Sequence, residues 1–348
     1  MASRIRILLV DDSSTIRLIL SQILARDPQL EIAGTAVNGR EALDKLDELR
    51  PDFVLLDVEM PVMDGLTALA ALRQSHPRLP VIMFSRLTQR GVEATIDALL
   101  LGANDYVPKP EAVDEVERTI EQELIPKIKA LATPRRESPS AETSRSGLVP
   151  QRKSAVPEVV VIAASTGGPM ALAPLLSSLP KRITTPVLVV QHMPPNFTAT
   201  FAERLCTKTE LNVREAEEDQ AIASAQVWIA RGGCHMVVAQ ATNEIRVQLN
   251  HAPAENSCCP SADVLFRSAT EIYGSRILAV VLTGMGKDGL AGCRAIKEQG
   301  GTILVQDEAS SVVWGMAGHV ARAGLAEDVL PLDQLGPEIT SRLSSRSS

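Results

Sequence analysis

The segment from Val159 to Gly168 constrains the fold of this chain more than any other. Four β-branched residues and two alanines run directly into Ser165-Thr-Gly-Gly, and Pro169 follows. Such a run predicts a buried strand that stops abruptly and turns into a helix. A serine at that turn lies at the carboxyl edge of a sheet, close to the N–H groups that begin the helix. The segment therefore predicts either an activated nucleophile or an anion-binding loop.

Apolar runs alternate with amphipathic stretches along both halves of the chain. In the first half they predict strands at residues 5–10, 31–36, 53–57, 81–85 and 105–107. In the second half they predict strands at residues 159–163, 187–191, 227–230, 245–249, 277–282 and 302–306, some of them antiparallel between 225 and 250. Strands that alternate with helices form parallel sheets wrapped by helices. We expect an α/β protein: a doubly wound N-terminal domain with a five-stranded parallel sheet, linked to a second, Rossmann-like parallel-sheet domain.

A polar segment from about residue 130 to 155 separates the two halves. It is rich in serine and proline and contains almost nothing that could be buried, which is typical of an interdomain linker. A chain of 348 residues has the length of two ordinary domains. We place the first domain at 1–125, a flexible linker at 126–155 and the second domain at 156–345.

Composition excludes several classes of protein. The net charge of -7 and the pI near 5.4 argue against a nucleic-acid partner. No apolar run reaches the roughly 18 residues of a membrane span, and the N-terminus leads directly into a strand rather than a signal peptide. The five cysteines have no zinc-type spacing, and their odd number suits reduced thiols. We expect a cytoplasmic protein.

Acidic and basic side chains end the predicted strands of the first half. Asp11 and Asp12 end the first strand, Asp57 ends the third, Ser85 ends the fourth and Lys109 follows the fifth. In a doubly wound sheet these positions converge at the carboxyl ends of the strands. Carboxylates gathered there suit Mg²⁺, and a carboxylate held beside Mg²⁺ and a lysine can accept a phosphoryl group.

This half resembles the receiver domain of response regulators over residues 4–125. The matching motifs are Leu-Leu-Val-Asp-Asp-Ser, Leu-Leu-Asp-Val-Glu-Met-Pro-Val-Met-Asp-Gly, Met-Phe-Ser and Val-Pro-Lys-Pro, in that order. The resemblance implies that Asp57 is the phosphoacceptor and that Asp11, Asp12 and Asp57 bind Mg²⁺.

The same resemblance assigns three switch residues. Ser85 is the hydroxyl that follows the phosphoryl group, Lys109 is its counter-charge, and Tyr106 is the aromatic residue that changes rotamer on activation. The Lys109-Pro110 bond is a candidate for the cis form.

A nucleophile at Ser165 needs a base. Of the five histidines, His192 directly ends a predicted strand, as Ser165 does. His235 follows two glycines. A role in the backbone or in a substrate loop is therefore an alternative to the role of catalytic base for this residue. A solvated or structural side chain is the default for the remaining histidines: His76, His251 and His319.

The base in turn needs an orienting carboxylate. Asp288 lies in a glycine-rich loop just after the predicted strand 277–282. Asp219, Asp263 and Asp307 are weaker candidates, although Asp307 also ends a strand.

The order of these residues distinguishes the known arrangements. The order serine, histidine, aspartate, with Ala163 in place of the first glycine of G-x-S-x-G, disfavours an α/β-hydrolase. Geometry rather than order defines a triad, so the chemistry remains available. The alternative, a phosphate cradle, lacks both the P-loop lysine and a G-x-G-x-x-G motif.

The second half resembles the catalytic domain of CheB-type chemotaxis protein-glutamate methylesterases. The matching motifs are Ala-Ser-Thr-Gly-Gly-Pro, Gln-His-Met-Pro, Pro-Ser-Ala-Asp-Val-Leu-Phe-Arg and Thr-Gly-Met-Gly-Lys-Asp-Gly. The resemblance implies a carboxylic ester hydrolase that cleaves glutamate γ-methyl esters on the cytoplasmic helices of methyl-accepting chemoreceptors, and deamidates certain receptor glutamines. Ester hydrolysis itself needs no cofactor.

The resemblance also implies the role of each site residue. Ser165 attacks the ester, His192 relays the proton and Asp288 orients the imidazole. The Met285 N–H is the oxyanion donor, and Thr166 is a partner of His192.

One departure from the family concerns the residues before the Pro260 motif. Many members carry a histidine there, whereas this chain has Cys258 and Cys259. The departure bears on rate or specificity and leaves the triad intact.

Regulation follows from joining the two halves. The resemblance implies that a chemotaxis-type histidine kinase is the phosphodonor. It also implies that the protein meets the membrane only through the receptors. We expect the unphosphorylated receiver to block Ser165 and phosphorylation of Asp57 to relieve the block.

Two other classes of protein stay open: a binding module that has lost catalysis, and a response regulator with a DNA-binding output. The intact Ser165, the acidic charge and the absence of a helix-turn-helix pattern argue against them.

Overall fold

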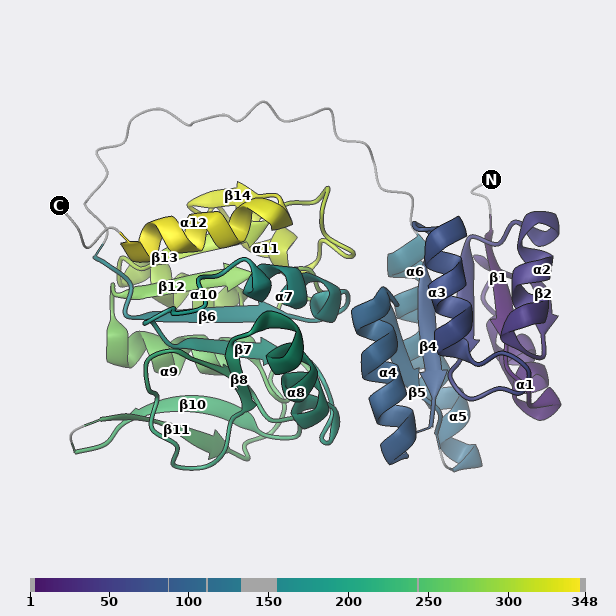
Figure 1. Ribbon diagram of the computed structural model, residues 1–348, viewed down its shortest axis with the longest axis horizontal. Helices are drawn as coiled ribbons and strands as arrows, with labels where there is room; N and C mark the ends of the chain where they lie inside the picture. Colours follow the sequence, from purple (N-terminus) through teal and green to yellow (C-terminus); the bar gives the residue numbers. More distant parts are fainter. Residues whose placement is uncertain (1–3, 87, 111, 133–154, 243, 345–348) are drawn as a thin grey trace. The chain divides into compact units, whose positions relative to one another are not determined.

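The computed structural model describes residues 4–86, 88–110, 112–132, 155–242 and 244–344. The chain forms two compact units, residues 1–133 and 134–348 (Figure 1). None of the helices in these described ranges is long and apolar enough to cross a membrane.

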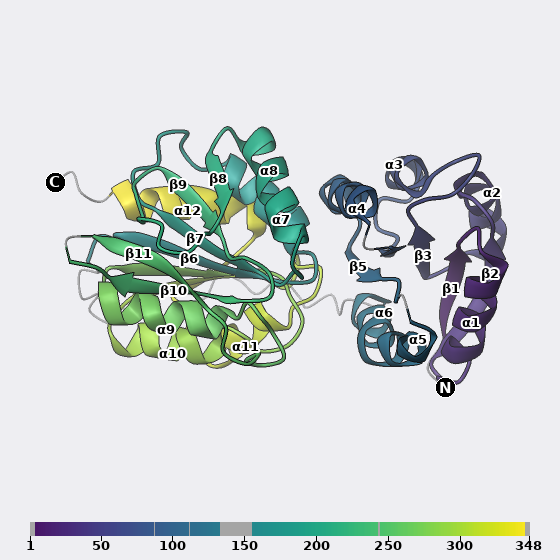
Figure 2. The same ribbon diagram turned by 90° about the horizontal axis from the view of Figure 1, so that it is seen from below.

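The N-terminal unit is a five-stranded parallel sheet of order β2-β1-β3-β4-β5. Its strands are β1 (Ile5–Val10), β2 (Leu30–Ala36), β3 (Phe53–Asp57), β4 (Val81–Ser85) and β5 (Asp105–Pro108). Its helices are α1 (Ser14–Leu24), α2 (Gly39–Leu49), α3 (Gly65–Ser75), α4 (Gln89–Leu101), α5 (Val113–Thr119) and α6 (Ile125–Ala132), with a π-helical turn at Ile120–Leu124 between the last two. Helices α2, α3 and α4 cover one face, and α1, α5 and α6 cover the other (Figure 2). The predicted doubly wound sheet is confirmed.

Local sequence signals explain where these helices begin. Ser13, Asn38, Asp64 and Thr88 each precede a helix and accept a hydrogen bond from the N–H three residues later. Such caps satisfy donors that the first turn leaves unpaired. Strands β3 and β4 are buried along their whole length, as expected for central parallel strands covered on both faces.

Two details of the N-terminal unit correct the sequence analysis. The predicted linker began at residue 126, but α6 is helical to Ala132, and Ile128 is completely buried in the core. The apolar spacing of Leu124, Ile128 and Leu131 continues the helix beyond the predicted boundary. The rest of the predicted linker, residues 133–154, lies outside the described residues. Among the described peptide bonds, the cis bond precedes Pro260 and not Pro110.

The C-terminal unit is built on a seven-stranded parallel sheet of order β14-β13-β12-β6-β7-β9-β8. Its strands are β6 (Val159–Ala164), β7 (Val187–Gln191), β8 (Asn212–Glu215), β9 (Gln226–Ile229), β12 (Ile277–Val281), β13 (Thr302–Gln306) and β14 (Asp328–Leu330). The predicted second parallel-sheet α/β unit is confirmed. The antiparallel strands expected between 225 and 250 are a separate hairpin of β10 (His235–Gln240) and β11 (Ile245–Asn250), whereas β9 is parallel in the main sheet.

Helices again cover both faces of this sheet. They are α7 (Gly168–Ser177), α8 (Phe197–Thr209), α9 (Ala262–Tyr273), α10 (Leu290–Glu298), α11 (Met316–Arg322) and α12 (Leu332–Ser344). Helices α7, α8 and α12 lie on one face and α9, α10 and α11 on the other, and the β10–β11 hairpin packs against α9 (Figure 2). A largely aliphatic core between these layers holds the strands rigidly, so side chains at their carboxyl ends have defined positions.

Candidate active site and receiver site

Three adjacent strands at the centre of the C-terminal sheet carry the predicted triad. β6 lies between β7 and β12. Ser165 follows β6 directly, and its N–H donates to the Thr283 carbonyl in the loop after β12 at 3.1 Å. His192 follows β7, and its N–H donates to the Ala164 carbonyl at 3.1 Å. These backbone hydrogen bonds continue the pairing of the sheet beyond the ends of the strands. They place Ser165 and His192 on adjacent backbone segments.

The turn after β6 holds Ser165 half-buried at the sheet edge. The Gly168 N–H donates to the Ser165 carbonyl at 2.7 Å, and Gly167 adopts a φ of 77°, which favours glycine. This is the strand-to-helix turn that the sequence predicted.

The loop after β12 packs closely against Ser165. A Cβ added to Gly284 would lie 2.8 Å from the Ser165 Cβ and 2.5 Å from the Met316 sulfur, so only glycine fits there. Met285 is the next residue, and its N–H therefore belongs to a backbone segment beside the serine. Thr166 is buried, and its carbonyl accepts a hydrogen bond from the Thr283 hydroxyl at 2.9 Å. The roles of Met285 and Thr166 toward the reaction remain predictions.

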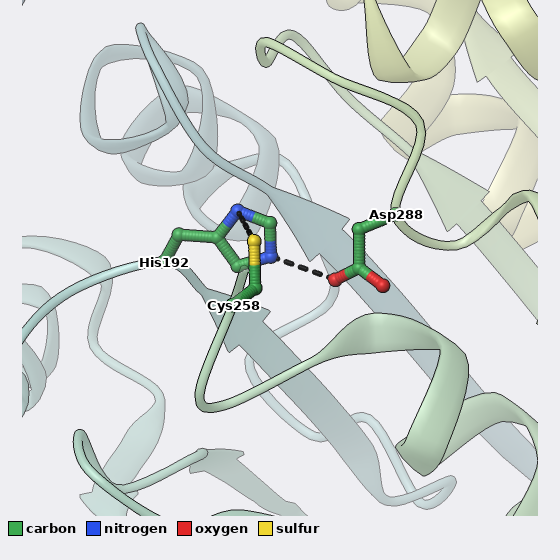
Figure 3. Close-up of side chains that lie close together, drawn as sticks. All are labelled: His192, Cys258 and Asp288. Carbon is green, nitrogen blue, oxygen red and sulfur yellow. Dashed lines mark hydrogen bonds and ion pairs between the residues drawn. The ribbon is translucent and has the colours of Figure 1, made fainter. Parts of the chain in front are cut away.

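His192 and Asp288 form a close pair. The His192 Nε2 lies 2.8 Å from the Asp288 Oδ2 (Figure 3). Burial lowers the pKa of His192, but the hydrogen bond and the charge of Asp288, with the Cys258 thiol, outweigh it and raise the pKa to about 9. For Asp288, burial raises the pKa, and the imidazole and other donors outweigh it and lower the pKa to about 2. The carboxylate therefore stays ionised at neutral pH.

The start of helix α9 orients the Asp288 carboxylate. Its oxygens accept hydrogen bonds from the Ser261 hydroxyl at 2.7 Å, the Ala262 N–H at 2.7 Å and the Asp263 N–H at 3.2 Å. The Asn256 side-chain amide adds a longer contact at 3.4 Å. The positive end of a helix favours a carboxylate. With both oxygens engaged, Asp288 can rotate little.

The pairing with Asp288 decides which imidazole nitrogen can act as a base. In the neutral imidazole, Nε2 keeps its hydrogen for Asp288, and Nδ1 carries the free lone pair. Nδ1 lies 3.5 Å from the Cys258 sulfur, which overlaps the imidazole ring in the view of Figure 3. The sulfur, a ring nitrogen and an Asp288 oxygen lie within 4.8 Å of one another. Among the described residues, the Ser165 hydroxyl makes no hydrogen bond to His192. Catalytic hydrogen bonds are often long in free enzymes and tighten when the substrate binds.

The competing histidines and aspartates are engaged elsewhere. His235 is buried, where its Nδ1 accepts from the Ser261 N–H and its Nε2 donates to the Pro253 carbonyl. Asp263 accepts from the Gly292 N–H at 2.7 Å, and Asp307 accepts from the N–H and hydroxyl of Ser310. Asp219 pairs with Arg246 on the surface. These contacts stabilise loops, so His192 and Asp288 are the pair available for chemistry.

Three contacts of the site were missed from the sequence: Ser261, Asn256 and the position of Cys258. The signal for Ser261 was present, because a serine immediately before an apolar helix is a typical N-cap residue, and Ser261 is the N-cap of α9. Asn256 and Cys258 lie in an irregular loop, and no sequence pattern indicates which side chains such a loop faces.

The predicted receiver residues converge at the carboxyl edge of the N-terminal sheet. The Lys109 ammonium lies 2.6 Å from the Asp57 Oδ2 and 2.7 Å from the Asp11 Oδ2, and all three side chains are buried. Asp12 is exposed next to them. Burial raises the pKa of Asp57 to about 6, more than Lys109 lowers it. The structure therefore brings together the residues that the resemblance assigned to phosphorylation.

Two of the three switch residues, Ser85 and Tyr106, lie on neighbouring strands. Ser85 ends β4, and its carbonyl accepts the Lys109 N–H at 2.7 Å. The Tyr106 ring on β5 is buried, and the Lys127 ammonium lies 5.4 Å from its centroid. Burial raises the pKa of the Tyr106 hydroxyl well above its usual value. The switching roles of Ser85 and Tyr106 remain predictions.

The donor set at this edge fits a hard divalent cation. Carboxylate oxygens of Asp11, Asp12 and Asp57 lie within 4.8 Å of one another. Oxygen ligands from one or more carboxylates, completed by water, are what Mg²⁺ prefers. The acidic cluster is thus compatible with the predicted magnesium.

The first unit has the acidic site of a receiver. The second unit has a His–Asp pair beside a serine that follows a strand. Together they define a response regulator with a hydrolase output. The family model for the response regulator receiver domain matches residues 7–121, and the model for the CheB methylesterase matches residues 160–339. The chain belongs to the CheB methylesterase family.

Relatives match along almost the whole chain. A protein-glutamate methylesterase/protein-glutamine glutaminase of Nocardioides sp. is 50% identical, covering 98% of this chain and 96% of its own length. A protein of the same name from Trichodesmium erythraeum is 46% identical, covering 98% and 99%. The crystal structure of the Thermotoga maritima CheB methylesterase catalytic domain matches with a TM-score of 0.52 at 38% identity, over 54% of this chain and 99% of that domain.

Proposed function

We propose that this chain is a phosphorylation-activated protein-glutamate methylesterase that also deamidates glutamine. The observation that carries the proposal is the His192–Asp288 pair at the sheet edge where Ser165 ends the neighbouring strand. The substrates are γ-methyl esters of glutamate, and certain glutamines, on cytoplasmic helices of chemoreceptors. A chemotaxis-type histidine kinase supplies the phosphoryl group.

Hydrolysis begins with attack of the Ser165 hydroxyl on the ester carbonyl. Nδ1 of His192 takes the hydroxyl proton, while Asp288 holds the imidazole by Nε2 and stabilises its positive charge. The Met285 N–H stabilises the negative oxygen that forms on the carbonyl. Collapse of the tetrahedral intermediate expels methoxide, which leaves as methanol with the proton from His192. An acyl-serine remains.

The second half of the reaction repeats these steps with water. His192 removes a proton from water, the resulting hydroxide attacks the acyl-serine, and Ser165 leaves with the proton. The product is a free glutamate side chain. A glutamine amide follows the same route with ammonia as the leaving group, which accounts for two activities at one site.

The receiver unit controls this reaction. Asp57 accepts the phosphoryl group, and Lys109 neutralises the added charge at the position where it pairs with the carboxylate. Asp11, Asp12 and Asp57 would hold Mg²⁺, which stabilises the transferring phosphoryl oxygens when bound. Ser85 and Tyr106 then respond to the phosphoryl group, and the receiver's two-state equilibrium shifts.

Replacing Asp57 by asparagine is expected to abolish activation by phosphorylation. Methanol release from methylated receptor cytoplasmic fragments is measured with and without a small-molecule phosphodonor and Mg²⁺. Wild type releases methanol faster with the phosphodonor, whereas Asp57→Asn keeps only its basal rate because no carboxylate can be phosphorylated. The matched control is Asp44→Asn, which changes an exposed carboxylate on α2 and should respond like wild type. A full response from Asp57→Asn would refute its role as phosphoacceptor.

Deleting residues 1–149 is expected to raise the basal rate of methanol release. The unphosphorylated receiver is proposed to restrain the esterase. Removal of the receiver should therefore raise the rate of methanol release, as phosphorylation of Asp57 does. The truncated protein should also lose its response to the phosphodonor. The same basal rate in the truncated and full-length chains would argue against restraint and would leave activation by the phosphorylated receiver as the remaining mode of control.

A further inference from the structure

The loop from Glu255 to Cys258 brings a thiol to the imidazole of the active site. The Cys258 sulfur lies 3.5 Å from His192 Nδ1, and the other ring nitrogen, Nε2, lies 2.8 Å from the Asp288 carboxylate (Figure 3). Nδ1 is the nitrogen that the proposed mechanism assigns to Ser165. Cys258, His192 and Asp288 thus form a compact cluster of a thiol, a base and a carboxylate, with one atom of each within 4.8 Å of the others.

The backbone of this loop is a tight hairpin that gives the thiol a defined position. The Cys258 N–H donates to the Glu255 carbonyl at 2.9 Å, and the Glu255 N–H donates to the Cys258 carbonyl at 3.1 Å. Between them, Asn256 and Ser257 have φ values of 53° and 63°. Two positive φ values in a two-residue turn are typical of a type I′ hairpin.

Side chains pin this hairpin to helix α9. Arg267 donates two hydrogen bonds to the Glu255 carboxylate, at 2.8 and 2.6 Å. The Asn256 amide donates to the Asp263 carboxylate at 2.9 Å. The bidentate Arg267–Glu255 pair and the Asn256–Asp263 hydrogen bond both join the loop to α9, and they fix its position relative to the active site. The contact between thiol and imidazole is therefore built into the fold.

The other cysteines lack this environment. All five lie in the described part of the chain, and Cys258 is the one whose sulfur hydrogen-bonds to an imidazole. Cys293 is completely buried, and burial raises the pKa values of Cys234, Cys259 and Cys293. Cys206 is half-exposed on α8, as Cys258 is in its loop, which makes it an internal reference.

We propose that Cys258 is an activated thiol and a site of covalent modification by small disulfides. His192 Nδ1 takes the proton of the Cys258 thiol, and the thiolate attacks one sulfur of the disulfide. The disulfide's S–S bond breaks as the Cys258 mixed disulfide forms. The departing thiolate takes the proton from the imidazolium and leaves as a thiol.

The modification switches the esterase off reversibly, a consequence that rests on the proposed function. In the proposed mechanism Ser165 uses the imidazole nitrogen that Cys258 contacts, so a group attached to the thiol would stand where the serine hydroxyl must approach. Reduction by an excess of thiol removes the group and restores the base. Formation of the mixed disulfide itself does not depend on ester hydrolysis.

The test treats the full chain with oxidised glutathione at neutral pH and follows adducts by intact-protein and peptide mass spectrometry. Methanol release from receptor fragments is measured on the same samples before and after dithiothreitol. Wild type is compared with Cys258→Ser, with Cys259→Ser as the matched neighbouring control, and with His192→Gln for adduct formation alone.

The expected result is an adduct at Cys258 that forms about threefold or more faster than at Cys206 in the same molecule, because His192 Nδ1 lies within reach of the Cys258 thiol proton. His192→Gln removes this preference. Methanol release falls in parallel with the adduct in wild type and Cys259→Ser, returns with dithiothreitol, and is insensitive to the disulfide in Cys258→Ser.

Equal rates at Cys258 and Cys206, or an undiminished preference in folded His192→Gln, would overturn the activation. An adduct that forms at Cys258 without loss of methanol release would overturn the switch. A chain that forms the Cys258 adduct but releases no methanol under any condition would count against the proposed function, while the thiol assignment would stand.

Discussion

Replacing Ser165 by alanine is expected to reduce the kcat for methanol release by a factor on the order of 10⁶, as removal of the nucleophile does in serine hydrolases. Without the hydroxyl, His192 has no group to activate for attack, and no acyl-enzyme forms. The serine lies at the end of β6 against Gly284, so alanine fits the same space and should leave the fold intact. Methanol release from methylated receptor fragments, measured with phosphodonor and Mg²⁺, gives the comparison.

The matched control for this variant is Ser177→Ala. Ser177 is exposed on α7, and its hydroxyl donates only to the Ala173 carbonyl of its own helix. Its loss should change methanol release little. If Ser165→Ala retained activity within about tenfold of wild type, another group would have to attack the ester, and the assignment of the nucleophile would be wrong.

Replacing Asp288 by asparagine is expected to lower kcat by a factor on the order of 10⁴. The carboxylate accepts the Nε2 hydrogen of His192 and thereby leaves the Nδ1 lone pair for the serine. An amide that turns its NH₂ group toward Nε2 would impose the opposite tautomer, with the hydrogen on Nδ1, and the base would be lost. Asp307→Asn is the matched control, because Asp307 also ends a strand of this sheet but accepts from Ser310.

The same variant should change the pH dependence. A raised pKa keeps His192 protonated to higher pH, so wild-type kcat/KM should rise with pH toward about 9 as the imidazolium releases its proton. In Asp288→Asn the charge that raises the pKa is gone while burial still lowers it, so the rise should move to lower pH. Unchanged pH profiles in the two proteins would contradict the coupling of His192 to Asp288.

Much of the fold could be predicted because its central strands are continuous apolar runs. β1, β3, β4, β7 and β13 have the bounds that the sequence predicted. The short strands β8 and β14 at the edges of the second sheet were missed, since edge strands are only partly buried and carry no such run. The two-domain organisation was also predictable, but the first unit extends to residue 133 because helix α6 follows the expected boundary without a break.

The candidate site was predictable only as far as its residues end strands. Ser165, His192 and Asp288 follow three strands of one parallel sheet, so topology alone brings them to one edge. Spacing alone left Asp307 open beside Asp288. The family resemblance chose Asp288, and in the structure it is Asp288 that hydrogen-bonds to His192. The nitrogen that faces Cys258 could not be predicted either, because it depends on a hairpin whose anchors lie on a different element.

The position of the triad on three neighbouring strands has a consequence for the newly made chain. Ser165 and His192 leave the ribosome first, and Asp288 follows 96 residues after His192. Its strand, β12, pairs with β6 on the side opposite β7, so the sheet around the serine stays unfinished until that late segment arrives. A nascent or truncated chain that stops before β12 has a serine and a histidine but no carboxylate to orient the base. Catalytic power therefore cannot appear before translation has passed Asp288.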